Sequence, residues 1–111
     1  MREWDVEFQR LERPDAQVLA ISGEIDLAVA AKFAQELEKL IDDSNGDTGL
    51  VDLSGVSFMD SSGIRELLKA KRDAEARGKA LVLLTPSDPC RRVLEISGAA
   101  DEFTILDNAA S

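Results

Sequence analysis

Apolar residues along the chain follow two spacings, one typical of strands and one typical of helices. Near the N-terminus, Trp4, Val6 and Phe8 alternate with polar residues, which predicts a half-buried strand at the edge of a sheet. The polar segment 10–17 predicts a turn. Continuous apolar runs predict buried strands at residues 18–21, 50–53 and 80–84, and residues 103–106 predict a last short strand.

Apolar residues at helical spacing separate these strands. The first predicted helix carries an apolar face made of Val29, Phe33, Leu37, Leu40 and Ile41. Asp26 is a good N-cap residue for it. A second helix follows the serines near residue 62 and ends at Gly78, and a third follows Ser87 and ends at Gly98.

The order of these elements predicts the fold class. Strand, strand, helix, strand, helix, strand, helix, strand indicates an α/β fold in which helical crossovers join parallel neighbours. We expect a mixed sheet of four to five strands, with an antiparallel first strand at its edge, the others largely parallel, and helices packed on it. A chain of 111 residues predicts one domain over residues 1–111, with an ordered core at about 3–107.

Charge and cysteine content narrow the class of protein. The net charge is −9, from 22 acidic and 13 basic residues, which argues against nucleic acid or an anionic membrane as the main partner. Cys90 is the single cysteine, so no internal disulfide forms, and we expect a plain half-buried thiol. Neither a signal peptide nor a membrane-spanning run is recognisable, so a cytoplasmic protein is predicted.

Several absences bear on catalysis. The chain has no histidine, which removes serine–histidine and cysteine–histidine nucleophile systems and most zinc sites. It also lacks a glycine-rich phosphate loop. Carboxylate-based enzymes remain possible in principle, but no acidic pair is recognisable. We therefore predict no catalytic residue, no metal site, no cofactor and no enzymatic activity.

The sequence Asp60-Ser61-Ser62-Gly63 is the main candidate for chemistry. It follows the strand at 50–53 across a predicted loop and begins the second helix. Helix N-termini favour anions, so a phosphate is one interpretation, and an ordinary helix cap is the other. If Ser62 is the cap, Arg65 occupies the position where a capping box has Glu or Gln. Loops at the carboxyl ends of parallel strands share one edge, so we expect residues 23–26 beside this stretch.

Three separated segments resemble the STAS family, specifically the bacterial anti-sigma factor antagonists. They are Gly23-Glu24-Ile25-Asp26 after the second strand, Phe58-Met59-Asp60-Ser61-Ser62-Gly63 before the second helix, and residues 92–98 in the third. The order of elements is similar too, so the resemblance covers nearly the whole chain.

The resemblance implies a partner-switching mechanism. An antagonist of this family binds an anti-sigma factor serine kinase and thereby frees a sigma factor. The kinase then phosphorylates the serine after the aspartate, which corresponds to Ser61, with Ser62 as the second choice, and a serine phosphatase resets the switch. The implied partner-binding residues are Gly23, Glu24, Asp26, Asp60, Ser61, Ser62, Gly63 and Arg65.

Arg65 is a departure from the family pattern, because related sequences often have a second glycine at this position. It is either a residue that selects a kinase or pairs with a phosphoserine, or an ordinary exposed helix residue. The alternative function is that of a structural STAS subunit in a lipid-transport or stressosome-type assembly, without regulated phosphorylation. A third hypothesis, phosphate acceptance at Asp52, lacks a recognisable acidic pair. For the chain itself we expect a monomer or weak dimer.

Overall fold

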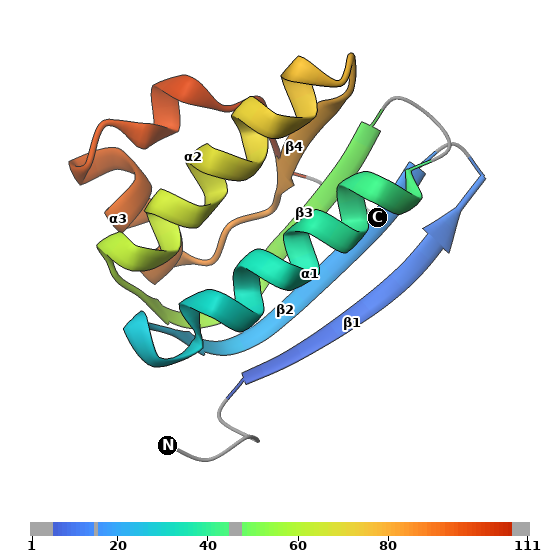
Figure 1. Ribbon diagram of the computed structural model, residues 1–111. Coiled ribbons are helices and arrows are strands. Elements are labelled where there is room, and N and C mark those ends of the chain that lie inside the picture. The colour runs from blue at the N-terminus through green and yellow to red at the C-terminus, as the bar shows by residue number, and fades with distance from the viewer. Residues whose placement is uncertain (1–5, 15, 45–47, 108–111) are drawn as a thin grey trace.

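The computed structural model describes residues 6–14, 16–44 and 48–107 (Figure 1). Five strands, three α-helices and two short 3-10 helices make up this part of the chain. In order they are β1 (Val6–Arg13), β2 (Ala16–Ile25), η2 (Leu27–Val29), α1 (Ala30–Asp43), β3 (Thr48–Met59), α2 (Ser61–Ala76), β4 (Ala80–Leu84), α3 (Asp88–Ile96), η3 (Ala99–Glu102) and β5 (Ile105–Leu106).

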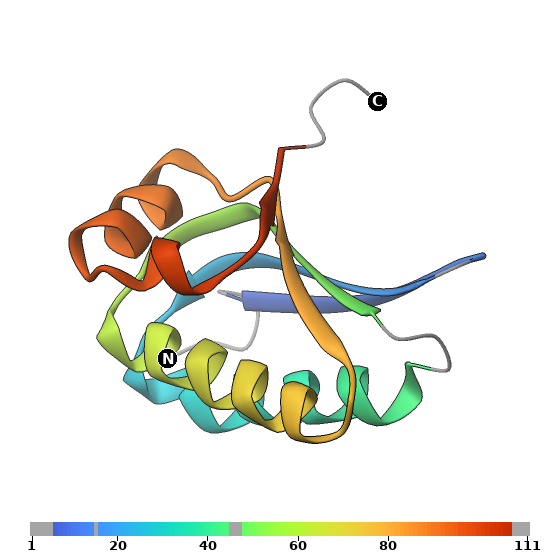
Figure 2. The same ribbon diagram turned by 90° about the horizontal axis from the view of Figure 1, so that it is seen from above.

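The strands form one sheet in the order β1-β2-β3-β4-β5. β1 is antiparallel to β2, and the other neighbouring pairs are parallel. This arrangement confirms the predicted α/β class and the antiparallel edge strand. Helices α1 and α2 lie side by side on one face of the sheet, and α3 lies at the end of the sheet where β3 runs on past β4 (Figures 1 and 2).

The core lies between the sheet and the pair α1 and α2. Leu19, Val51 and Leu83 are fully buried and lie opposite one another on three neighbouring strands. The predicted apolar face of α1 is buried against them, and α2 adds Leu67. Burial of large apolar side chains on this scale supplies the main stabilisation of such a domain. None of the described helices has the length and apolar content needed to cross a membrane.

The turn predicted at residues 10–17 is in the right place but far too long. β1 continues to Arg13 and β2 begins at Ala16, so the connection is confined to the residues around Pro14. Side-chain hydrogen bonds between the two strands stabilise this polar part of the hairpin. In one of them the Arg10 guanidinium donates to the Gln17 side-chain oxygen at 2.9 Å. One face of the hairpin is open to solvent, so its polar residues are compatible with a strand. Trp4 lies outside the described residues.

The loop predicted after Leu53 is wrong, because β3 continues to Met59. Its register with β2 shifts twice, between Ala20 and Ser22 and again between Gly23 and Glu24. Each shift places one extra residue on β3, which is the pattern of a β-bulge. Bulges interrupt the alternation by which a strand is recognised in a sequence, and this explains the missed length.

Gly55 lies at the first of these shifts and is required there for steric reasons. A Cβ atom at this position would lie 2.8 Å from the Cβ of Ser22 and 3.1 Å from the carbonyl oxygen of Ile21. The close approach of β2 and β3 therefore depends on a residue without a side chain.

Helix α3 takes the place beside β3 that β4 leaves open. β4 pairs with β3 only as far as Leu84, which lies opposite Asp52. Ser87 then caps α3, as predicted, and its backbone N–H donates to the carbonyl of Leu53 at 3.1 Å. Of the last predicted strand, only Ile105–Leu106 pairs with β4.

We predict that Gly55→Ala destabilises the domain by about 1–3 kcal/mol, because the added methyl group must push the two strands apart. Urea unfolding measured against the unsubstituted protein tests this. Ser54→Ala is the matched control, since Ser54 is the exposed neighbour of Gly55, and its change should stay within about 0.5 kcal/mol. Equal effects of the two substitutions would contradict the steric role of Gly55.

Candidate functional site

The candidate site lies where β2 and β3 end side by side. Ile25 pairs with Met59 at the ends of the two strands. Asp26 and Asp60 are the residues that directly follow these strand ends. The backbone N–H of Asp60 donates to the carbonyl of Ile25 at 3.2 Å. The start of α2 and η2 consequently lie at the same end of the molecule (Figures 1 and 2). This confirms the predicted shared edge, although residues 23–25 belong to β2 and not to a loop.

Asp60 is the N-cap of α2, in place of Ser62. Its carboxylate accepts hydrogen bonds from the Ser62 backbone N–H, at 2.9 Å, and from the Ser62 hydroxyl. The backbone N–H groups of Gly63 and Ile64 donate to the Asp60 carbonyl at 3.1 and 3.3 Å. The N–H groups of residues 62–64 in the first turn are therefore already engaged by Asp60.

The two serines differ in their accessibility. Ser61 is the first helical residue and is exposed, and its hydroxyl has no hydrogen-bond partner among the residues that the structure describes. Ser62 is only 7% exposed and donates its hydroxyl to Asp60. An enzyme that approaches the surface therefore meets the oxygen of Ser61, whereas that of Ser62 belongs to the helix cap.

Gly63 lets the first turn of α2 pack closely on the strand ends. A Cβ atom on Gly63 would lie 2.9 Å from the Cγ of Met59 and 3.0 Å from the Cγ2 of Ile25. These two side chains come from β3 and β2. The glycine therefore fixes the height of Ser61 above the sheet.

The loop after β2 adds a second capped turn. Asp26 accepts a hydrogen bond from the Ala28 backbone N–H at 3.0 Å and caps η2, as predicted for the start of the helical region. Glu24 is exposed at the end of β2, and Gly23 adopts a φ of 106° within that strand. Of the three partner-binding residues predicted in this segment, Gly23, Glu24 and Asp26, the last two have polar side chains at this edge of the sheet.

Two exposed apolar side chains accompany the serine. Leu27 is 73% exposed on η2, and Phe58 is 47% exposed on β3, where it pairs with Glu24. Sequence reasoning included Phe58 in a motif without giving it a role and missed Leu27. The available signal was a large apolar residue next to capping residues and outside the periodic face of α1. We call Glu24, Asp26, Leu27, Phe58 and Ser61 the serine rim.

The family that matches this chain is described as "Mlab, STAS domain", and the match spans residues 8–107. The chain belongs to the STAS-domain family.

Similar proteins of this family carry antagonist names. An anti-sigma-B factor antagonist of Listeria monocytogenes is 36% identical over 85 residues, which is 77% of this chain and 74% of that protein. The unphosphorylated form of the anti-sigma factor antagonist SpoIIAA has a TM-score of 0.73 at 26% identity, with 93% and 90% of the chains covered. An anti-sigma factor antagonist of Mycobacterium paratuberculosis has a TM-score of 0.84 with 96% and 90% covered, but at 20% identity it shows the fold alone.

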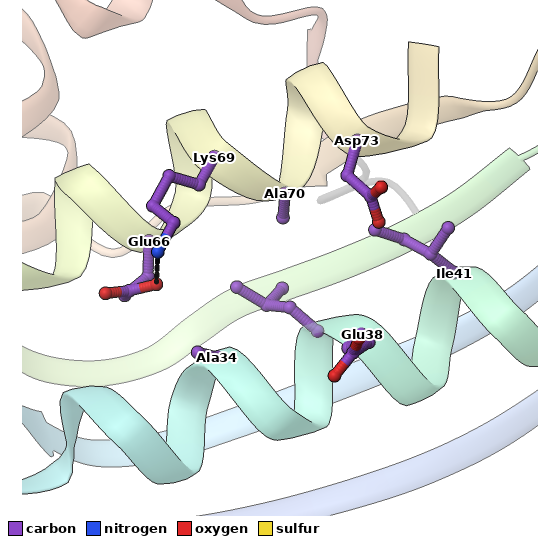
Figure 3. Close-up of a pocket in the computed structure, with 8 residues that line it drawn as sticks. Ala34, Glu38, Ile41, Glu66, Lys69, Ala70 and Asp73 are labelled. Atoms are coloured by element: carbon purple, nitrogen blue, oxygen red, sulfur yellow. Dashed lines mark ion pairs between the residues drawn. The ribbon is translucent and has the colours of Figure 1, made fainter. Parts of the chain in front are cut away.

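A groove of the STAS domain lies away from the serine rim. It has a volume of about 230 Å³ and opens between α1 and α2 (Figure 3). Its lining consists of Ala34, Leu37, Glu38, Ile41, Glu66, Lys69, Ala70 and Asp73. Lys69 is paired with Glu66 at 3.7 Å. The groove contains no residue of the three motifs. Within the described ranges, no cluster of three metal-ligating side chains occurs.

Cys90 is fully buried, and not half-buried as expected. Burial raises the pKa of its thiol from 9.0 to about 11, and the nearby charge of Arg91 only partly opposes this shift. The thiol lies on the face of α3 that packs into the core together with Leu94. It is a packing residue and takes no part in the serine rim.

We predict that Asp60→Ala destabilises the domain by about 1–2 kcal/mol, since it removes the helix cap and leaves the Ser62 hydroxyl without its acceptor. The free energy of unfolding in urea is the measurement. Asp60→Asn is the control, because asparagine caps helices as well as aspartate does, and it should retain most of the stability. An alanine variant as stable as the asparagine variant would refute the cap.

Cys90 should make stability depend on alkaline pH. Its pKa is higher in the folded protein, so the thiol favours folding below about pH 9, and this contribution is lost as pH rises toward about 11. Cys90→Ala should lack this part of the alkaline decline. Urea unfolding of both proteins across this pH range tests the difference, and parallel pH profiles would show that the thiol contributes nothing.

Proposed function

We propose that this STAS domain is an anti-sigma factor antagonist whose binding is switched by phosphorylation of Ser61. In the unphosphorylated form it binds an anti-sigma factor serine kinase and releases the sigma factor. The kinase then transfers the γ-phosphoryl group of ATP to the Ser61 oxygen, the complex dissociates, and a serine phosphatase restores the free hydroxyl. The observation that carries this proposal is the exposed Ser61 hydroxyl at the first position of α2, beside a buried Ser62.

The serine rim supports the docking part of the proposal. Leu27 and Phe58 offer exposed apolar area next to the ends of β2 and β3, where the Asp60 N–H donates to the Ile25 carbonyl. Exposed apolar side chains at a functional edge are typical of the centre of a protein–protein interface. Glu24 and Asp26 surround them with negative charge, so a partner with a basic surface is favoured and nucleic acid is disfavoured.

Electrostatic repulsion and desolvation explain how one phosphate on Ser61 causes the complex with the kinase to dissociate. A phosphate adds about −1.5 to −2 charges at pH 7 to an edge that already contains three carboxylates, those of Glu24, Asp26 and Asp60. Burying such an anion beneath a partner without compensating charges costs several kcal/mol. Each ~1.4 kcal/mol is tenfold in affinity, so the complex dissociates while the domain stays folded.

The proposal assigns no catalysis to this chain. The kinase and the phosphatase supply the chemistry, and Ser61 is their substrate. Such a switch acts in the cytoplasm, where the kinase has ATP. Similarity to SpoIIAA supports the phosphorylation step, since that protein from Bacillus has also been solved in its phosphorylated form, with a TM-score of 0.67 at 26% identity.

We predict that Ser61→Asp weakens binding to the cognate anti-sigma kinase by about 100-fold or more, since a buried negative charge costs several kcal/mol. Isothermal titration calorimetry with the purified kinase measures the effect. The unfolding free energy should change by less than about 0.5 kcal/mol, because Ser61 is exposed.

Gln9→Glu is the matched control for added charge. Gln9 is exposed on β1 and pairs with Ala20, which lies five residues before Ile25 and therefore roughly 17 Å along β2 from the serine rim. This variant should bind the kinase like the unsubstituted protein. Tight binding by Ser61→Asp would refute the switch, and kinase-dependent phosphate incorporation into Ser61→Ala would show that another residue is the acceptor.

A structural STAS subunit of a larger assembly is the second candidate function. The observation that favours it is that the matching family is named after Mlab and not after the antagonists. In such an assembly Ser61 would act as a contact without being modified. Mass spectrometry of the protein isolated from its own cells distinguishes the two, since a phosphate on Ser61 supports the switch. A permanently unmodified serine in a stable complex with a transporter ATPase supports the subunit.

A further inference from the structure

Arg65 is a cation without an acidic partner on a helix whose other cations are mostly paired. Within the described residues, no ion pair or hydrogen bond involves its side chain, and the side chain is exposed. Its neighbours three and four positions away on α2 are Ser61, Ser62, Leu68 and Lys69, none of which is acidic. By contrast, the paired cations are Lys69 with Glu66, Lys71 with Glu75 and Arg77 with Asp73. The guanidinium of Arg65 is therefore available.

The geometry of an α-helix directs this guanidinium toward Ser61. Residues four apart lie on the same side of a helix, with Cβ atoms roughly 5–6 Å from each other. Helical side chains also lean toward the N-terminus, so Arg65 covers the turn that begins with Ser61. A planar guanidinium presents two parallel N–H donors that match two phosphate oxygens, whereas a lysine ammonium acts as a point charge without this fixed geometry.

No other feature at the start of α2 would neutralise a phosphate on Ser61. The N–H groups of residues 62–64 already donate to Asp60, so the helix terminus offers little to a further anion. On α2 itself the nearest charged residues are Arg65 and Glu66, and Glu66 is paired with Lys69. The charged residues at the ends of the neighbouring strands are Asp60, Asp26 and Glu24, and all three are negative. Arg65 is the only cation in residues 61–68, which form the first two turns of α2.

We infer that Arg65 forms an ion pair with the phosphate on Ser61 and holds it against the first turn of α2. This inference rests on the proposed function, in which Ser61 is the phosphorylated residue. The pair gives the phosphate a fixed place on the surface of the domain. It also favours the doubly charged form of the phosphate at neutral pH, because a nearby cation stabilises the more negative state.

The test installs the phosphate without any kinase. Phosphoserine is incorporated at position 61 by genetic-code expansion or semisynthesis, and ³¹P NMR then follows the second ionisation of the phosphate as a function of pH. Free phosphoserine ionises near pH 6. We expect the pKa of the phosphate to be higher by about 0.15–0.4 in Arg65→Ala than in the unsubstituted phosphoprotein, the shift that a helical pair of this spacing supplies.

Arg72→Ala is the matched control. Arg72 lies on the same helix, is exposed, and has no ion pair within the described part of the chain, but it is eleven residues from Ser61, or roughly 16 Å along the axis. Its removal takes away the same charge and should leave the pKa of the phosphate almost unchanged. The three carboxylates are identical in every variant, so the difference between the two alanine variants isolates Arg65.

The result that overturns the pair is an identical titration for Arg65→Ala and Arg72→Ala. Arg65→Gln keeps most of the side-chain length, so it replaces the alanine variant if circular dichroism shows that alanine disturbs the fold. Failure of the pair leaves the proposed switch standing, because the phosphate is installed chemically. Failure of a kinase to phosphorylate Ser61 would refute the switch without affecting the titration.

Discussion

The hydrogen bond from the Asp60 backbone to the carbonyl of Ile25 is the joint on which the site depends. It connects the end of β3 to the end of β2, at the point where each strand is followed by a helix. Asp60 also caps α2 through its side chain and its carbonyl group. A single residue therefore joins the end of β2 to the start of α2, where Ser61 is the first helical residue. Rigid positioning of this kind is what a surface switch requires.

This joint exists only because β2 and β3 are longer than their hydrophobic runs. The pairing beyond Ala20 passes two bulges and needs the close approach at Gly55 before it reaches Ile25 and Met59. Bulges increase the local twist of a strand and re-aim the residues that follow. The irregular part of the sheet therefore determines where the site residues lie. The regular part, opposite α1 and α2, contains the core that stabilises the domain.

The difference between regular and irregular parts also decides what the sequence could predict. The apolar face of α1, the bounds of β4 and the capping role of Ser87 followed from periodicity and capping rules, because packing and propensity agree there. The ends of β2 and β3 did not, since serines and glycines are typical both of loops and of bulged strands. Ser62 was considered as the cap because hydroxyl residues are common caps, but only the structure shows that the preceding carboxylate engages it.

The site residues divide in the same way. The motif identified Ser61 and its neighbours, but it could not separate an exposed hydroxyl from a buried one, since both are serines at the same helix start. Leu27 was missed because a single apolar residue between capping residues belongs to no periodic pattern. Its exposure becomes apparent only when η2 is seen to lie outside the face that α1 buries.

The use of the helix N-terminus by Asp60 has a consequence for how a phosphate would act. An anion at an uncapped helix start gains from free N–H groups, and phosphorylation then changes the stability of the domain itself. Here the N–H groups of residues 62–64 already donate to Asp60, so they add little to the stabilisation of a phosphate on Ser61. The phosphate then acts mainly on the binding free energy of the complex, because burial at the interface increases its desolvation cost. A fold whose stability changes little on phosphorylation can be switched in both directions without unfolding, which is the property that a reversible partner switch needs.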